Sequence, residues 1–374
     1  TTFRDTGKTL TRTLAATAAQ PRDRARLDAR LSIDSGIVVK LQGARIEVEM
    51  GAQLIAEGEA GRQVIFTSRL DDRYGAGGTF DTNNDDAAAA ETSPSAGNWG
   101  GLYIGQLASA SIDRALITFA GGNVPVGSNF AAMNPVEIHQ AKVRIRNSSF
   151  ESNASGGPAG NRSGLSPNAA GTIFVRAAQP VLLNNIFVNN AGPVVNINVN
   201  ALNKDFLADY GRSTGLADRQ LNYSDNQGPL IRDIVLDGNT LNGMVVRGET
   251  LTTQSIWDDT GIVHILGDEV YVPNMHTFGG IRLESSSTES LVVKLSGVNA
   301  GFTAGGTTAD VTDRIGGMLH IVGQPGHPVV LTSLNDDSVG AGFNLQGLLQ
   351  KDTNGNGPGS AAPGDWRGIN IDRY

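Results

Sequence analysis

Residues Gly51 to Gly77 read GAQLIAEGEAGRQVIFTSRLDDRYGAG, and residues Gly316 to Gly342 read GGMLHIVGQPGHPVVLTSLNDDSVGAG. The two stretches align without a gap at a constant offset of 265 residues (316 − 51). Apolar, glycine, hydroxyl and acidic positions all return: Leu54 as Leu319, Gly58 as Gly323, Gly61 as Gly326, Thr67-Ser68 as Thr332-Ser333 and Asp71-Asp72 as Asp336-Asp337. Agreement at one fixed offset indicates an internal duplication.

The duplication extends in both directions once small insertions are allowed. Upstream, GIVVKL (36–41) returns as SLVVKL (290–295); downstream, DTN (81–83) returns as DTN (352–354), and GNWGGLYI (97–104) as GDWRGINI (364–371). We therefore expect an N-terminal edge or cap segment over 1–30, a first repeat unit over 31–295 and the start of a second over 296–374. With no initiator Met or signal peptide, we expect a mature or excised segment of a longer array.

Composition favours a β-rich extracellular scaffold over a helical cytosolic enzyme. Of the 374 residues 18% are charged, 48 are glycine and none is cysteine, which rules out disulfides and cysteine metal sites. The formal net charge of −8 argues against nucleic-acid binding through a basic surface. No apolar run approaches the roughly 18 residues that a membrane span requires.

From Leu31 onward the chain consists of short apolar runs ended by Gly, Asn, Asp or Ser. Three segments share one pattern of strand, polar turn, single large apolar residue and asparagine: 142–153, 181–190 and 230–246. Successive short strands in a parallel stack bring the same position of each rung above the last. We expect Phe150, Phe187 and Leu241 to stack, and Asn153 and Asn190 to bond to the neighbouring rung from corners with left-handed backbone.

This pattern resembles the right-handed parallel β-helix proteins of the pectate-lyase-like superfamily, from about Leu31 to Tyr374. The duplicated cassette is similar to repeats of very large secreted β-helix proteins of bacteria. The resemblance implies an all-β solenoid with long loop insertions, which we expect at 78–98, 154–170 and 200–228. A short helix is expected within 203–222.

The strongest ligand-like feature is the acidic loop DTNNDD (81–86) with its counterpart DTNGNG (352–357). Oxygen-bearing side chains at alternate positions suit a hard cation such as calcium, and Gly357 falls where such a loop turns sharply. The twelfth positions are Thr92 and Pro363 in place of the usual glutamate, and solvated turns are the alternative. The predicted calcium ligands are Asp81, Asn83 and Asp85, then Asp352, Asn354 and Asn356, with Asp71, Asp72, Asp336 and Asp337 completing the shells.

Catalysis is the competing hypothesis, because the superfamily includes lyases and hydrolases of acidic polysaccharides. A lyase needs a calcium-holding carboxylate cluster and a base on an adjacent rung, and a glycosidase needs two carboxylates. Candidate members are Arg144, Arg146, Arg232, Asp233 and Asp237. Against them, Arg144 and Arg146 alternate with apolar residues as on the ordinary outward side of a rung. No catalytic residue and no organic cofactor is therefore assigned.

Trp99 and Trp366 occupy equivalent positions in the two copies. Each enters an apolar strand after a polar turn, which favours a structural plug over a sugar-stacking ring. The expected function is a structural or adhesive segment of a large secreted or cell-surface protein that associates end to end with copies of itself or with adjacent repeats. The alternative is a polysaccharide-binding or polysaccharide-cleaving protein.

Overall fold

The computed structural model describes residues 29–75, 78–84, 93–158, 162, 164–213, 223, 226–274, 280–306 and 316–371. Among these residues the structure is all-β, and the helical element is a single turn at Val199–Ala201. No helix in the described ranges is long and apolar enough to cross a membrane. The strands are β1 Arg30–Ile33, β2 Val38–Leu41, β3 Ile46–Val48, β4 Gln53–Glu57, β5 Val64–Ser68, β6 Leu102–Ile104, β7 Ser109–Asp113, β8 Ala115–Thr118, β9 Asn123–Val126, β10 Asn129–Ala132, β11 Val136–His139, β12 Lys142–Arg146, β13 Ser149–Glu151, β14 Ile173–Arg176, β15 Val181–Leu183, β16 Ile186–Val188, β17 Pro193–Asn198, β18 Leu230–Arg232, β19 Val235–Asp237, β20 Leu241–Arg247, β21 Gln254–Trp257, β22 His264–Leu266, β23 Glu269–Val272, β24 Gly280–Glu284, β25 Val292–Leu295, β26 Gly297–Ala304, β27 Met318–Val322, β28 Val330–Ser333 and β29 Trp366–Ile371.

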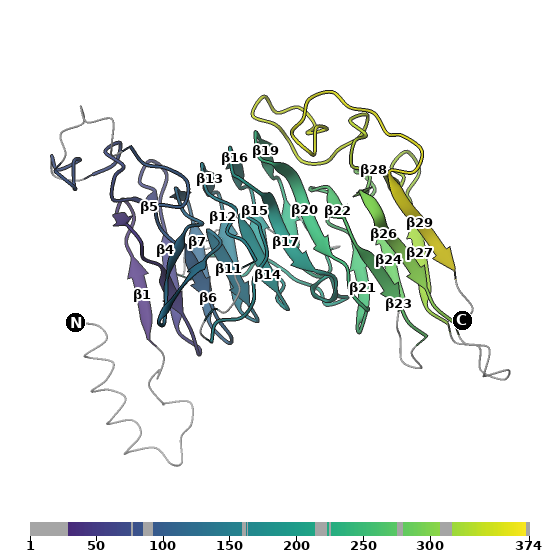
Figure 1. Cartoon of the computed structure of the whole chain (residues 1–374), viewed down its shortest axis with the longest axis horizontal. Helices are drawn as coiled ribbons and strands as arrows, with labels where there is room; N and C mark the ends of the chain where they lie inside the picture. The colour runs from purple at the N-terminus through teal and green to yellow at the C-terminus, as the bar shows by residue number, and fades with distance from the viewer. Residues whose placement is uncertain are drawn as a thin grey trace, which may run out of the picture.

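The strands form parallel sheets that run along the length of the molecule (Figure 1). Sheet 1 has the order β1-β4-β7-β12-β15-β18, sheet 2 β2-β5-β8-β13-β16-β19, and sheet 3 β3-β6-β11-β14-β17-β20-β22-β25-β28. From β1 to β20 the chain visits sheets 1, 2 and 3 in turn and then starts the next round, so each strand of these sheets pairs with its counterpart one round away. Apart from these sheets, β9 and β10 form a small antiparallel hairpin.

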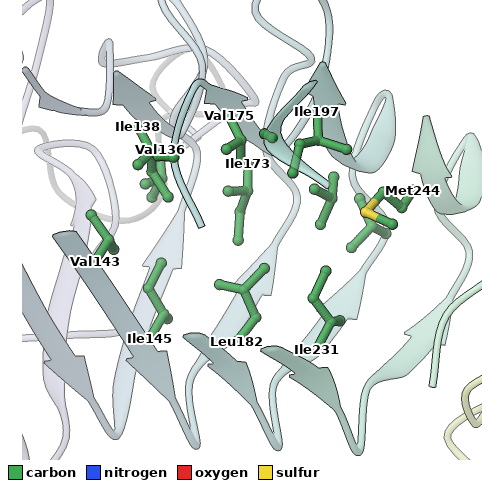
Figure 2. Close-up of a cluster of buried hydrophobic side chains, with 14 of the residues drawn as sticks. Val136, Ile138, Val143, Ile145, Ile173, Val175, Leu182, Ile197, Ile231 and Met244 are labelled. Carbon is green, nitrogen blue, oxygen red and sulfur yellow. The ribbon is translucent and has the colours of Figure 1, made fainter. Parts of the chain in front are cut away.

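The core lies between the sheets as rows of aligned aliphatic side chains. Ile145, Leu182 and Ile231 are in register along sheet 1, and Ile138, Val175 and Ile197 are in register along sheet 3. All six are buried, and Figure 2 shows the two rows facing each other across the interior. Identical positions of successive rounds therefore pack on one another, which is why the sequence repeats its apolar pattern.

An aromatic stack and an asparagine ladder follow this register. Phe150 and Phe187 stack with ring centroids 4.7 Å apart and planes 8° from parallel, as predicted. The prediction that Leu241 extends the stack is wrong, because Leu236 is the register partner of Phe187, while Leu241 begins β20 and is half-buried.

The ladder asparagines bond to neighbouring rounds as expected. Asn153 Nδ2 donates to Asn190 Oδ1 at 2.8 Å, and Asn190 Nδ2 donates to Asn239 Oδ1 at 2.8 Å and to the carbonyl of Phe150 at 2.9 Å. The left-handed backbone lies one residue earlier than expected, at Ser152 (φ 52°) and Asn189 (φ 55°). That residue makes the corner, so the asparagine after it points into the interior.

Equivalent strands of the two copies belong to different sheets. β2 and β5 belong to sheet 2, but their sequence equivalents β25 and β28 continue sheet 3, whereas sheets 1 and 2 end at β18 and β19. β21-β24-β27 (sheet 4) and β23-β26-β29 (sheet 5) complete the second part. Local register survives the change: Val38 pairs with Ile65 in the first copy, and Val292 with Val330 in the second. Sheet 5 also crosses the expected unit boundary at Leu295.

The two sheets that end are capped at their edges. Asp259 Oδ1 accepts the backbone N–H of Ile231 at 3.0 Å on β18. A long loop over 334–365 arches from β28 back to β19 (Figure 1), where Phe343 exchanges backbone hydrogen bonds with Ile234 and Leu236. Among the described residues, these contacts partly cover the edges of sheets 1 and 2, and a covered strand edge is less open to pairing with another chain.

Candidate functional site

The two DTN loops are built around equivalent lysines. Lys40 Nζ donates to the carbonyl of Phe80 at 2.5 Å and lies 3.9 Å from Asp72 Oδ1. Lys294 Nζ donates to the carbonyl of Lys351 at 2.8 Å and lies 3.9 Å from Asp337 Oδ1. The duplicated sequence therefore reproduces a three-part arrangement of lysine, acidic pair and DTN loop.

In the second copy, Asp352 closes the loop on itself. Its Oδ1 accepts the backbone N–H of Asn356 at 3.2 Å, and its Oδ2 accepts that of Gly357 at 3.0 Å. Gly357 has φ of +81°, a conformation that glycine adopts without the strain other residues incur. The loop thus wraps around the Asp352 carboxylate, as a cation-binding loop of this type requires.

Asp337 and Asn354 are brought together by the same loop. Asp337 Oδ2 accepts the backbone N–H of Gly359 at 2.6 Å, and Asn354 Nδ2 donates to Asn335 Oδ1 at 3.1 Å. The remaining oxygens, Asp337 Oδ1 and Asn354 Oδ1, are buried and accept no hydrogen bond from any residue that the structure describes. Buried acceptors without a donor are uncommon and each costs stability.

The first acid of each pair, Asp71 or Asp336, accepts hydrogen bonds from its own turn. Asp71 is fully buried and accepts hydrogen bonds from Thr67 Oγ1 at 2.5 Å and from Arg73 Nε at 2.8 Å. Burial raises the pKa of Asp71, but the hydrogen bonds from Arg73 and Thr67 outweigh it, so the pKa lies below its usual value. Asp336 likewise accepts from Thr332 and Ser338, which lower its pKa. Both acids brace the turn after β5 or β28.

The remaining predicted ligands, Asp81, Asn83, Asp85 and Asn356, have fewer contacts among the described residues. Asp81 Oδ1 accepts the backbone N–H of Asn84 at 2.6 Å, so the first loop turns more tightly than the second. Asn83 is half-buried, Asn356 is exposed, and Asp85 lies outside the described residues. Across the described ranges no three His, Cys, Asp or Glu side chains converge to hold a metal ion. Calcium at these loops therefore stays a prediction.

Lys294 is the residue that the sequence reasoning missed. Its side chain is fully buried, and burial lowers its pKa, while Asp337, Asp336 and Asp352 act in the opposite direction. The available signal was the VVKL tetrapeptide itself, because a lysine kept in both copies of an otherwise apolar strand calls for a buried partner.

The arginines weighed as possible members of a catalytic site, Arg144, Arg146 and Arg232, are engaged in ion pairs. Arg144 is 2% exposed, with Nη1 2.9 Å from Asp113 Oδ2 and Nε 2.6 Å from Asp209 Oδ1. Burial lowers the pKa of Arg144, but the hydrogen bonds to Asp209 and Asp113 raise it above the ordinary value, the wrong direction for a base. Val143 and Ile145 lie in the core, so Arg144 takes the outward side of the rung as expected, but the segment that carries Asp209 covers it. In the described part of 203–222, residues 203–213 form no helix; residues 214–222 lie outside the description.

Trp99 is fully buried and its Nε1 donates to the carbonyl of Thr118 at 2.8 Å. Its ring is part of the core, so no face is free for a sugar. Trp366 is half-buried and packs against the same core. The structural interpretation holds for Trp99.

An open cleft of about 630 Å³ lies where sheets 1 and 2 end. Hydroxyl groups, two carboxylates, an arginine and two aromatic rings contribute to its lining. Arg232 is held by the carbonyls of Ile231 and Asp258 at 2.9 Å each, and Thr260 Oγ1 donates to Glu289 Oε2 at 2.7 Å. Sequence reasoning named Arg232 and Asp233 but not the cleft, which depends on the change of sheets.

Comparisons with protein-family models, curated proteins and solved structures found no match to this chain.

Proposed function

We propose that the chain is a right-handed parallel β-helix that serves as a structural or adhesive segment of a large secreted or cell-surface bacterial protein, and that its open ends are covered by further coils of the same kind. The ordered passage through three sheets and the in-register interior rows support the solenoid. The low charge and the abundance of glycine support an extracellular setting.

The observation that carries the proposal is a difference in burial between identical sequences. VVKL at 292–295 is buried at every position, because β22 and β28 flank it. VVKL at 38–41 is only half-buried at every position, because β2 is the edge of sheet 2. Within the described residues, the first copy therefore lacks a covering strand that the second copy has.

The opposite end gives the reciprocal result. β6 is buried at all three positions, but its equivalent β29 is mostly exposed. Ile321 and Ile369 continue interior rows, since they pair with the buried Leu283 and Phe302, yet they are 45% and 40% exposed. Interior aliphatic positions that remain exposed, beside strand edges that no described strand pairs, favour association.

The test is the oligomeric state of this chain, measured by sedimentation over a wide concentration range. We expect association that grows with concentration and is lost in Ile321→Lys and Ile369→Lys, because a lysine in an interior row blocks stacking. Val298→Lys is the matched control, since Val298 is 81% exposed on a central strand of sheet 5. A monomer at all concentrations, or association that survives both end variants, contradicts end-to-end assembly.

Polysaccharide binding or cleavage is the second candidate, and the cleft beside Arg232 supports it. Hydroxyl and carboxylate side chains beside aromatic rings suit a hydroxylated ligand. A screen of acidic polysaccharides should give binding that Arg232→Gln or Glu289→Gln weakens, with ultraviolet detection of unsaturated products separating a lyase from a binding protein. No binding by any polysaccharide contradicts this second function.

A further inference from the structure

The second DTN loop holds two buried oxygens for which the described protein supplies no donor, Asp337 Oδ1 and Asn354 Oδ1. The side chain of Asp337 is only 11% exposed. Each side chain is fixed through its other polar atom, by Gly359 or by Asn335, so the free oxygen has a set direction. Asn354 belongs to the loop that closes around Asp352, and Asp337 is bonded to that loop through Gly359, so the two buried acceptors share one loop with the Asp352 carboxylate.

Lys294 does not satisfy these oxygens. Its Nζ lies 3.9 Å from Asp337 Oδ1, which is beyond hydrogen-bond range, and its hydrogen bond goes to the carbonyl of Lys351. Asp337, Asp336 and Asp352 each act to raise the pKa of Lys294, so the negative charge of three carboxylates acts on one ammonium group. The local charge remains negative, which favours a second cation.

We propose that this loop binds one calcium ion, with Asp337 Oδ1, Asn354 Oδ1 and a carboxylate oxygen of Asp352 as protein ligands. Calcium accepts carboxylate, amide and carbonyl oxygens together with water, in flexible geometry. It therefore does not need the three converging carboxylate or imidazole groups that the described residues lack. With few charged ligands, the dissociation constant belongs in the weak range of roughly 10⁻⁴ to 10⁻³ M seen in extracellular modules.

The first copy repeats the ligand types at equivalent positions. Asp72, Asp81 and Asn83 correspond to Asp337, Asp352 and Asn354, and Lys40 keeps the same 3.9 Å distance to Asp72. The inference does not depend on end-to-end assembly, because every proposed ligand lies within one copy.

Calorimetric titration of the full chain with calcium chloride, beside a magnesium chloride titration, tests the site. We expect calcium binding that Asp337→Asn and Asn354→Ala each weaken at least tenfold, and a lower melting temperature in chelator than in calcium. Asn129→Ala, on the exposed β10, is the matched control and should bind normally. No heat with calcium and an unchanged melting temperature would overturn the proposal, as would equal binding by the Asp337 and Asn354 variants.

Lys294→Met provides a second test should the ligand variants fail to fold. Removing a buried positive charge about 4 Å from a ligand oxygen should tighten calcium binding by about tenfold, because the repulsion between the two cations disappears. If Lys294 is instead the resident cation of the loop, this variant will be destabilised and calcium will neither bind more tightly nor restore it. That outcome refutes the calcium site.

Discussion

Thr353 is fully buried, whereas Thr82, its equivalent in the first copy, is exposed. The difference arises at the start of β20, where the backbone N–H of Asn242 donates to the carbonyl of Thr353 at 2.7 Å. Asn242 Nδ2 also donates to the carbonyl of Asp352 at 3.0 Å. One asparagine thus fastens the 334–365 loop to the edge that it caps.

Asn242→Ala should loosen this loop. Asn242 is 2% exposed, and its side chain makes two hydrogen bonds, to the carbonyl of Asp352 and from Asn239 Nδ2. Their loss leaves two polar groups without that partner, at a cost of about 1–3 kcal/mol for each buried one. Hydrogen exchange should quicken at Phe343 and Leu236, whose amides bond across the capped edge. The exposed Asn129→Ala serves again as control, and unchanged protection in Asn242→Ala would show that other contacts hold the loop.

Asn190→Ala should be among the more damaging substitutions in the interior. Asn190 Nδ2 donates to the carbonyl of Phe150 and to Asn239 Oδ1, and its Oδ1 accepts from the backbone and side chain of Asn153, so four buried polar groups lose a partner. At about 1–3 kcal/mol for the first unsatisfied group, we expect a total loss of several kcal/mol by urea unfolding. The neighbouring Asn189→Gly should cost little, since Asn189 is exposed at φ 55°. Similar losses for both would refute the special role of the ladder.

His264 should make the fold sensitive to acid. Burial lowers its pKa to about 3, and its ring stacks on Trp257 with centroids 5.2 Å apart. Because the unfolded chain binds this proton below about pH 6.5 and the folded chain only near pH 3, stability falls as pH falls between these values.

From pH 6.5 to pH 4.5 the expected loss through His264 is about 2–3 kcal/mol. His264→Gln should be less stable at neutral pH but lose less between pH 6.5 and 4.5, measured by urea unfolding. The exposed His320→Gln is the matched control. If the stability of His264→Gln falls as steeply between pH 6.5 and pH 4.5 as that of the parent chain, groups other than His264 cause the acid dependence.

Local features of this fold were readable from the sequence because they repeat. The spacing of three residues from Phe150 to Asn153 and from Phe187 to Asn190 predicted both ladders. The same spacing, applied from Asn239, selects Leu236 and would have avoided the wrong choice of Leu241. Register within each copy was likewise implied by the VVKL repeat.

The change of sheets, the capped edges and the cleft were not readable in this way. They depend on which segment of the chain packs over which strand edge. Such segments lie over a hundred residues apart, as do Leu236 and Gln350, which are joined by a hydrogen bond. The candidate calcium ligands were predicted from their spacing, but the burial of Lys294 beside them follows from packing against β22 and β28. Side-chain spacing in one segment carries no information about that packing.

The transfer of β25 and β28 from sheet 2 to sheet 3 affects more than the interior. The second copy is displaced by one sheet relative to the first, so a loop that follows sheet 2 in the first copy follows sheet 3 in the second. If further copies repeated this displacement, equivalent loops of successive copies would project in different directions around the long axis. The loops would then be distributed around the molecule and would not line up on one face.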